Sequence, residues 1–283
     1  MPSAAARRPR ARPVSTRSRR AGPALPAPAP PPQPVGYWAL SVRPLHVLAF
    51  LTPLIVLYEV GSVLHLSAPA GARTIQAKNL LAQFFETFGL AGVFLPGAAL
   101  VTVLVVWHVL TGDRWRVRPG VLAGMLLESA AWMLPLLVMG AVHLRAIAAS
   151  RAGTDPAGAG LVEAGAALDD LSWQARLTIA VGAGLYEEML FRLVAIALFH
   201  FVLADLLRAA RPTADVVAVA AAAVAFALYH DTALSAGGTN WPQLAFLTVA
   251  GAYLGTVYFV RGLGIVVATH ALYDVMVLVF LRR

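Results

Sequence analysis

Long apolar runs recur along the chain after residue 36, separated by short polar or basic segments. Most of them approach or exceed the roughly 20 residues that a helix needs to cross a bilayer. We interpret as spans the runs near residues 45–65, 88–111, 121–143, 177–204, 216–236, 243–260 and 263–281. The pattern predicts an all-α, polytopic helical membrane protein with about seven transmembrane helices, whose last two helices form a tight hairpin. Residues 74–87 and 161–176 lie between spans and are expected to form interfacial helices.

Composition supports this interpretation. Of the 283 residues, 59% are hydrophobic and 13% are charged, whereas a soluble globular domain has about 25% charged residues. A soluble helical protein with a large core is the less favoured alternative. The chain has no cysteine, which excludes disulfides and thiolate metal sites.

The positive charge is concentrated at the N-terminus. Eight arginines precede the first acidic residue, Glu59, and the remaining basic and acidic residues balance. Residues 1–36 also hold ten of the nineteen prolines, so we expect a disordered, basic, proline-rich tail followed by a helical membrane domain over 37–283. Because the excess charge belongs to the tail, the folded part is not predicted to bind nucleic acid.

The distribution of arginines predicts the orientation in the membrane. Cytoplasmic loops carry an excess of basic residues, which places the N-terminus and the second and fourth inter-span loops inside. These loops contain Arg114, Arg116, Arg118, Arg208 and Arg211. The loop at 144–176 holds four acids, Asp155, Glu163, Asp169 and Asp170. Arg282 and Arg283 would lie outside, against the trend. We expect an integral protein of the bacterial inner membrane with a cytoplasmic N-terminus.

Ionisable residues inside three of the predicted spans are candidates for function, because such groups cost about 2.5–3.5 kcal/mol at bilayer depth. They are Glu187, Glu188 and Arg192 on the fourth span, His230 on the fifth, and His270 and Asp274 on the seventh. Residues four apart share a helix face, so Glu188 is expected to pair with Arg192. Glu187, turned about 100° away, is left to face a cavity. Counting residues from the span ends places Glu187, His230 and His270 at similar depths.

Such a set supports hydrolysis. A carboxylate shielded from bulk water can take a proton from a water molecule, and nearby histidines can share that proton or stabilise an oxyanion. Glu187, His230 and His270 are also a zinc-ligand set that leaves a fourth position for water. Both routes end in cleavage of an amide, so a metal-free site and a site with a divalent metal such as zinc stay as alternatives.

At these residues the chain resembles the CPBP intramembrane proteases, the family of CAAX proteases and bacteriocin-processing enzymes. Their motifs EExxxR, FxxxH and HxxxN/D stand here as Glu187–Arg192, Phe226–His230 and His270–Asp274. The resemblance covers about 177–281. It implies a type II CAAX prenyl endopeptidase-like membrane enzyme.

The resemblance also implies residue roles and a partner. It makes Glu187 the general base, Glu188 with Arg192 a supporting pair, and His230 and His270 the residues that polarise water or the scissile carbonyl. Asp274 replaces an asparagine of the prenyl endopeptidases; an ionised aspartate cannot donate a hydrogen bond, so we expect it to orient His270. The predicted partner is a peptide or protein substrate at the lipid bilayer.

Two other classes of function stay open. Intramembrane Glu, His and Arg also build proton relays and ion-coupled transporters, although the chain shows no repeated halves. A non-catalytic scaffold or immunity protein of the same fold is the second alternative. Glu59 and Glu128, on the first and third spans, match no motif; we expect them to line the cavity, pair with a basic residue or lie near an interface.

Overall fold

The computed structural model describes residues 36–68, 71–72, 76–87, 89, 92, 94–151, 171–233 and 238–281. The predicted tail lies outside these residues apart from Gly36. The four acids predicted in the loop at 144–176 lie outside them as well, as does most of the predicted interfacial helix at 161–176.

Helices make up most of the described structure. In chain order they are α1 (Tyr37–Ser41), α2 (Pro44–His65), α3 (Gln76–Thr87), α4 (Leu95–Thr111), α5 (Pro119–Arg151), α7 (Trp173–Glu188), α8 (Ile196–His200), α9 (Arg211–Tyr229), α10 (Trp241–Arg261) and α11 (Leu263–Val275). π-Helical segments continue α7, α8 and α11; they are η2 (Met189–Ala195), η3 (Phe201–Leu206) and η4 (Met276–Phe280). A minimal antiparallel hairpin of β1 (Ser67–Ala68) and β2 (Gly71–Ala72) follows α2. The predicted all-α class is therefore confirmed.

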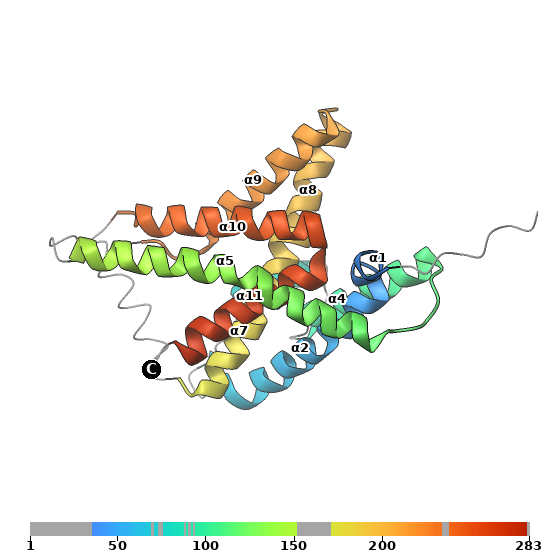
Figure 1. Ribbon diagram of the computed structural model, residues 1–283, viewed down its shortest axis with the longest axis horizontal. Coiled ribbons are helices and arrows are strands. Elements are labelled where there is room, and N and C mark those ends of the chain that lie inside the picture. The colour runs from blue at the N-terminus through green and yellow to red at the C-terminus, as the bar shows by residue number, and fades with distance from the viewer. Residues whose placement is uncertain are drawn as a thin grey trace, which may run out of the picture. The chain divides into compact units, whose positions relative to one another are not determined.

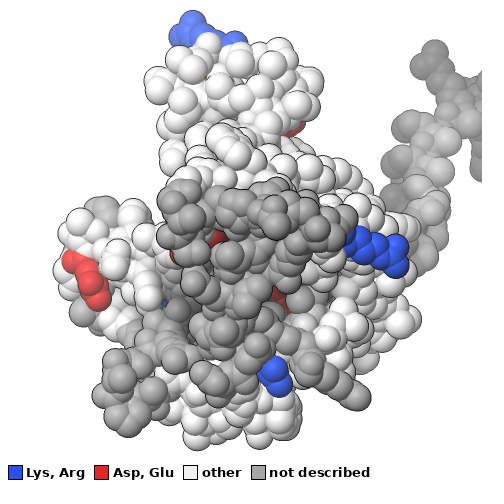
Figure 2. All heavy atoms as spheres, turned by 90° about the vertical axis from the view of Figure 1, so that its left-hand side faces the viewer, with Lys and Arg blue, Asp and Glu red and all other residues white. Residues whose placement is uncertain are grey.

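Six helical stretches among the described residues are long and apolar enough to cross a membrane. They are Pro44–His65, Pro119–Ala148, Trp173–Leu206, Arg211–Tyr229, Trp241–Arg261 and Leu263–Phe280. α4, at the position of the second predicted span, is apolar but has only 17 residues. The six stretches together with α4 agree with the prediction of about seven transmembrane helices. On the face seen in Figure 2, the described surface consists mostly of uncharged residues, as expected for an integral membrane protein.

Two of the predicted C-terminal ends of spans were wrong. α5 has 33 residues and extends well beyond 143. α9 ends at Tyr229 instead of near 236, because His230 adopts an extended backbone (φ −79°, ψ 146°). The Asp231 carboxylate then accepts a hydrogen bond from the Ala233 amide at 3.0 Å, a local turn that competes with helix continuation. The candidate site residue His230 consequently lies just after the helix and not within it.

The candidate site is carried by helices that pack closely together. α7 contacts α11 extensively, α5 crosses the other side of α11, and α2 packs on α7 (Figure 1). α9 lies against both α8 and α10. α10 turns directly into α11 at Gly262, whose φ of 78° is strained for other residues. This turn confirms the predicted hairpin of the last two helices and brings α11 back against α7.

Candidate active site

The last turn of α7 presents two carboxylates to the protein interior. α7 starts at a Ser172 cap, whose side chain accepts a hydrogen bond from the Ala175 amide. Sixteen residues later the α-helix gives way to the π-helical segment η2 directly after Glu188. Glu187 is 6% exposed and Glu188 is fully buried. π-Helical turns are frequent at functional sites, and this one contains Arg192.

Glu188 and Arg192 form the predicted ion pair. Nη1 of Arg192 lies 2.9 Å from Oε1 of Glu188, although the angle is not that of a hydrogen bond. Nη2 donates to the Gly251 carbonyl at 3.1 Å, and the guanidinium lies 4.7 Å from the centroid of the Phe226 ring. Arg192, 1% exposed, therefore ties α7 to α9 and α10.

His270 on α11 is held mainly by Glu188. Its Nδ1 lies 2.6 Å from Oε1 of Glu188, while its Nε2 lies 3.5 Å from Oδ2 of Asp274. The sequence had suggested Asp274 as the residue that orients His270. The structure places Asp274 beside the ring as expected, one helical turn away, but gives Glu188 the shorter contact.

His230 enters the site from the end of α9. Its Nδ1 lies 2.8 Å from the Phe226 carbonyl, and because a carbonyl can only accept, this nitrogen is the donor. Burial lowers the pKa of His230 below its usual value, while the bond to Phe226 acts in the opposite sense. The imidazole is therefore neutral at neutral pH, and its Nε2 carries a free lone pair.

The three predicted residues converge. Oε2 of Glu187 lies 3.8 Å from Nε2 of His230 and 4.0 Å from Nε2 of His270. Both separations are too long for a direct hydrogen bond and are distances that a bridging water can span. Among the residues that the structure describes, no group of three His, Asp or Glu side chains is arranged to hold a metal ion. The zinc alternative thus gains no support from the geometry.

Sequence reasoning missed Tyr229 as a neighbour of the site. Its ring packs edge-on against His230 and Phe191, with centroids 5.0 and 5.3 Å apart. The only signal in the sequence is its position directly before His230. In the helix that we expected there, neighbouring residues point in different directions, so Tyr229 would not have shared a face with His230.

Residues 170–276 match the family model described as Type II CAAX prenyl endopeptidase Rce1-like. This region is similar to that family, and residues 170–276 are called the Rce1-like region below. The match includes all six residues of the candidate site and agrees with the resemblance seen in the motifs. Searches of curated proteins and of solved structures found no match. At the level of the family, the match implies endopeptidase activity in the membrane.

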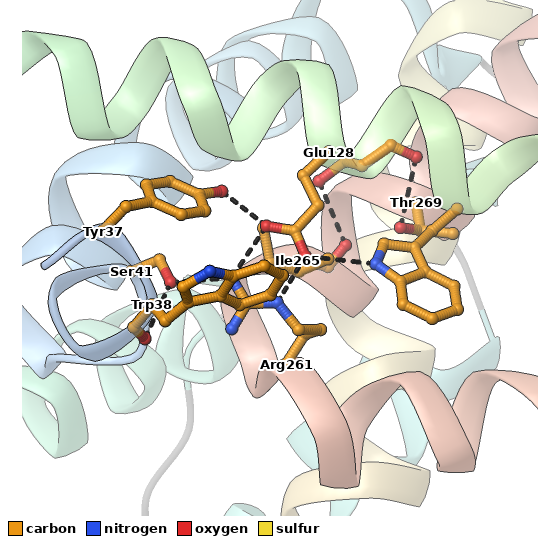
Figure 3. Close-up of polar contacts among 9 residues, drawn as sticks. Tyr37, Trp38, Ser41, Glu128, Arg261, Ile265 and Thr269 are labelled. Atoms are coloured by element: carbon orange, nitrogen blue, oxygen red, sulfur yellow. Dashed lines mark hydrogen bonds and ion pairs between the residues drawn. The ribbon is translucent and has the colours of Figure 1, made fainter.

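Helices before the Rce1-like region support it through a second polar network, centred on Glu128 of α5 (Figure 3). Arg261, at the end of α10, forms an ion pair with Glu128 through Nε and Nη2. The Tyr37 hydroxyl donates to the same carboxylate at 2.5 Å, and Trp132 donates at 3.2 Å. The network fixes α1 and the α10–α11 turn to α5.

The network continues along the seam between α5 and α11 toward the site. Oγ of Ser129 donates to the Ile265 carbonyl at 3.3 Å, and Oγ1 of Thr269 donates to the Ser129 carbonyl at 3.4 Å (Figure 3). Thr269 directly precedes His270. Of the outcomes expected for Glu59 and Glu128, pairing with a basic residue is confirmed for both, with Lys78 and Arg261 respectively.

Proposed function

We propose that the protein is an intramembrane endopeptidase that hydrolyses a peptide bond of a membrane-associated protein or peptide. The observation that carries the proposal is the convergence of Glu187 with His230 and His270, at 3.8 and 4.0 Å, within the Rce1-like region. Each of these residues comes from a different helix or helix end. Such convergence places a general base and possible oxyanion donors around one space, as amide hydrolysis uses them.

In this proposal Glu187 acts as general base. Its Oε2 takes a proton from a water molecule, and the water oxygen attacks the scissile carbonyl carbon. Neutral His230 accepts a hydrogen bond at Nε2 from the same water and so fixes its position. When the C–N bond breaks, Glu187 returns the proton to the leaving amine.

The remaining residues act on the oxyanion and on orientation. His270, held through Nδ1 by Glu188, presents Nε2 to the same space, where a protonated Nε2 donates to the developing oxyanion. Arg192 neutralises Glu188 and anchors it to α10. Asp274, 3.5 Å from Nε2 of His270, limits the directions in which the ring can turn.

We further propose that the end of the bundle carrying α1 faces the cytoplasm of a bacterial inner membrane. Arg43, before α2, pairs with Asp113 after α4 at 2.5 Å, so both helix ends lie together. Three more arginines, at 114, 116 and 118, follow within the same segment. A basic cluster of this kind favours the cytoplasmic side.

The test is cleavage of quenched fluorescent peptides ending in a CAAX sequence, prepared with and without a prenyl group, by protein purified in detergent. Glu187→Gln and His230→Asn should each lower kcat by about 10²–10⁴-fold while thermal unfolding stays cooperative. Glu86→Gln, an exposed carboxylate on α3, is the matched control and should retain full activity. If both site variants cleave at the wild-type rate, the peptidase activity does not depend on this site and the proposal is wrong. Comparison of the two peptides decides whether a prenyl chain is part of the substrate.

A further inference from the structure

A second charge pair, between the buried Lys78 and the partly buried Glu59, lies next to the turn of α7 that carries Glu187 and belongs to none of the family's motifs. Nζ of Lys78 on α3 lies 2.9 Å from Oε2 of Glu59 on α2. The Tyr186 hydroxyl on α7 donates a hydrogen bond to the other oxygen of Glu59. Lys78 is 2% exposed, and its ammonium lies 4.6 Å from the centroid of the Tyr58 ring. The pair thus joins α2, α3 and α7.

The pair is closely packed against α4 at Gly97. A Cβ atom on Gly97 of α4 would lie 2.9 Å from Oε1 of Glu59 and 3.1 Å from the Tyr186 hydroxyl. A buried ion pair contributes little net stability, because desolvation of both charges offsets their attraction. Its presence in an apolar helical protein therefore points to a role in function.

α3 depends on Lys78 for its attachment to the bundle. The helix has 12 residues, and its buried residues are Ala77, Lys78 and Leu81. Two of its larger apolar side chains, Leu80 and Phe84, are exposed. A helix this short is marginal without tertiary contacts. Because Ala77 and Leu81 are the only apolar residues of α3 that are fully buried, the ion pair with Glu59 is the strongest directional contact that α3 makes with α2.

α7 in turn connects the pair to the general base. The Tyr186 hydroxyl donates to Glu59, and Tyr186 is the residue directly before Glu187. α3 packs against the same helix. The last turn of α7, which carries the base, is therefore bound to the Lys78–Glu59 pair.

We infer that Lys78 is a positioning residue for the proposed endopeptidase. By pairing with Glu59 it holds the carboxylate that accepts the Tyr186 hydroxyl, and so keeps the last turn of α7 where Glu187 faces the two histidines. The inference rests on the proposed function, because the group being positioned is the base of that function.

The test uses Lys78→Met, which keeps most of the side-chain volume and removes the charge. We expect kcat to fall by about 10–100-fold, because small misplacements of a base are costly, with KM unchanged. Amide hydrogen exchange should rise over residues 76–87 and stay at the wild-type level in α7 and α11. Lys78→Arg, which keeps the charge, should restore most of the lost kcat. A merely structural role for Lys78 would not produce a loss confined to kcat.

Two results would overturn the inference: faster exchange in α3 with wild-type kcat, or unchanged exchange and unchanged kcat. If Lys78→Met fails to fold, Tyr186→Phe decides, since it removes only the hydroxyl that binds the last turn of α7 to Glu59. A wild-type kcat for Tyr186→Phe would then contradict the inference, and a loss confined to kcat would support it. Glu187→Gln is measured alongside. Cleavage by that variant would contradict the proposed function itself, whereas an inactive Glu187→Gln with a fully active Lys78→Met contradicts only the role of Lys78.

Discussion

Nδ1 of His270 lies 2.6 Å from the same Glu188 oxygen that lies 2.9 Å from the Arg192 guanidinium. One buried carboxylate oxygen therefore connects α11 to the π-helical segment after α7. With Nδ1 engaged, the other ring nitrogen is directed to the space shared with Glu187. Glu188 thus fixes the orientation of His270 and keeps its Nδ1 protonated, as carboxylates do for imidazoles in other hydrolytic sites; Nε2 donates when the ring carries its second proton.

Glu188→Gln should disable His270 without removing it. The glutamine amide cannot hold Nδ1 as the carboxylate does, so we expect kcat to fall by about 10²–10⁴-fold. The variant also leaves Arg192 buried without a counter-ion, which should cost about 3–5 kcal/mol of unfolding free energy. Steady-state cleavage and chemical denaturation in detergent measure the two effects.

The double variant Glu188→Gln/Arg192→Met separates these effects. Removing both charges should recover most of the stability, because a buried pair can often be replaced by uncharged residues. Activity should stay as low as in the single variant. A double variant that cleaves at the wild-type rate would show that Glu188 is a structural ion-pair partner and nothing more.

His230 should make stability depend on pH. Burial lowers the pKa of His230 in the folded protein relative to about 6.5 in the unfolded chain. At a pH between the folded and the unfolded pKa, the unfolded state binds more protons than the folded state. The contribution of His230 to the free energy of unfolding is therefore fully present above the unfolded pKa and is lost as pH falls toward the folded pKa. His230→Asn, which keeps a donor for the Phe226 carbonyl, should lose less Tm than wild type between pH 7.5 and pH 5. If Tm falls by the same amount in the wild type and in His230→Asn over this pH range, His230 is not a neutral buried residue.

The sequence was sufficient for the membrane class and for the residues that converge. Apolar run length predicts spans directly, and i, i+4 spacing correctly paired Glu188 with Arg192. It was insufficient where a contact depends on how two helices are rotated. The contact of Glu188 with His270 joins residues 82 positions apart, and the partners of Glu59 and Glu128 came from segments without motifs. The end of α9 at Tyr229 was missed because a local turn overrode an apolar pattern.

Chelation should leave the activity intact. No group of three His, Asp or Glu among the described residues suits a metal, and the proposed route needs none. We expect cleavage to survive dialysis against EDTA, with metal content checked by mass spectrometry. Activity that disappears on dialysis and returns with Zn²⁺ would instead support the alternative in which Glu187, His230 and His270 hold the ion.

Arg261→Lys should loosen α1 from the bundle. Arg261 is 3% exposed; it binds both oxygens of Glu128, donates to Ser41 at 2.9 Å and lies 4.0 Å over the Trp38 ring. A lysine cannot reproduce this planar, multidentate contact. We expect a loss of about 1–3 kcal/mol and faster amide exchange in residues 37–41. Arg145→Lys, at an exposed position on α5, is the control and should leave both quantities unchanged; equal effects in the two variants would argue against the network.

Gly184→Ala should separate the two helices that carry the site. A Cβ at Gly184 would lie 2.7 Å from the Ala271 amide nitrogen and 2.8 Å from the Val267 carbonyl oxygen. Both atoms are backbone, so α11 as a whole must move away from α7. We expect a loss of about 1–3 kcal/mol, as for other overpacked cores, and a fall in kcat because His270 moves with α11 relative to Glu187 and Glu188.

The matched control for Gly184 is Gly120→Ala near the start of α5, where a Cβ would meet no atom within 4 Å. That change should be neutral or slightly stabilising, since alanine has about 1 kcal/mol better helix propensity than glycine. Thermal unfolding and peptide cleavage are measured for both variants. Wild-type stability and activity in Gly184→Ala would mean that α7 and α11 are not in backbone contact, and the geometry that brings His270 to the two glutamates would have to be abandoned.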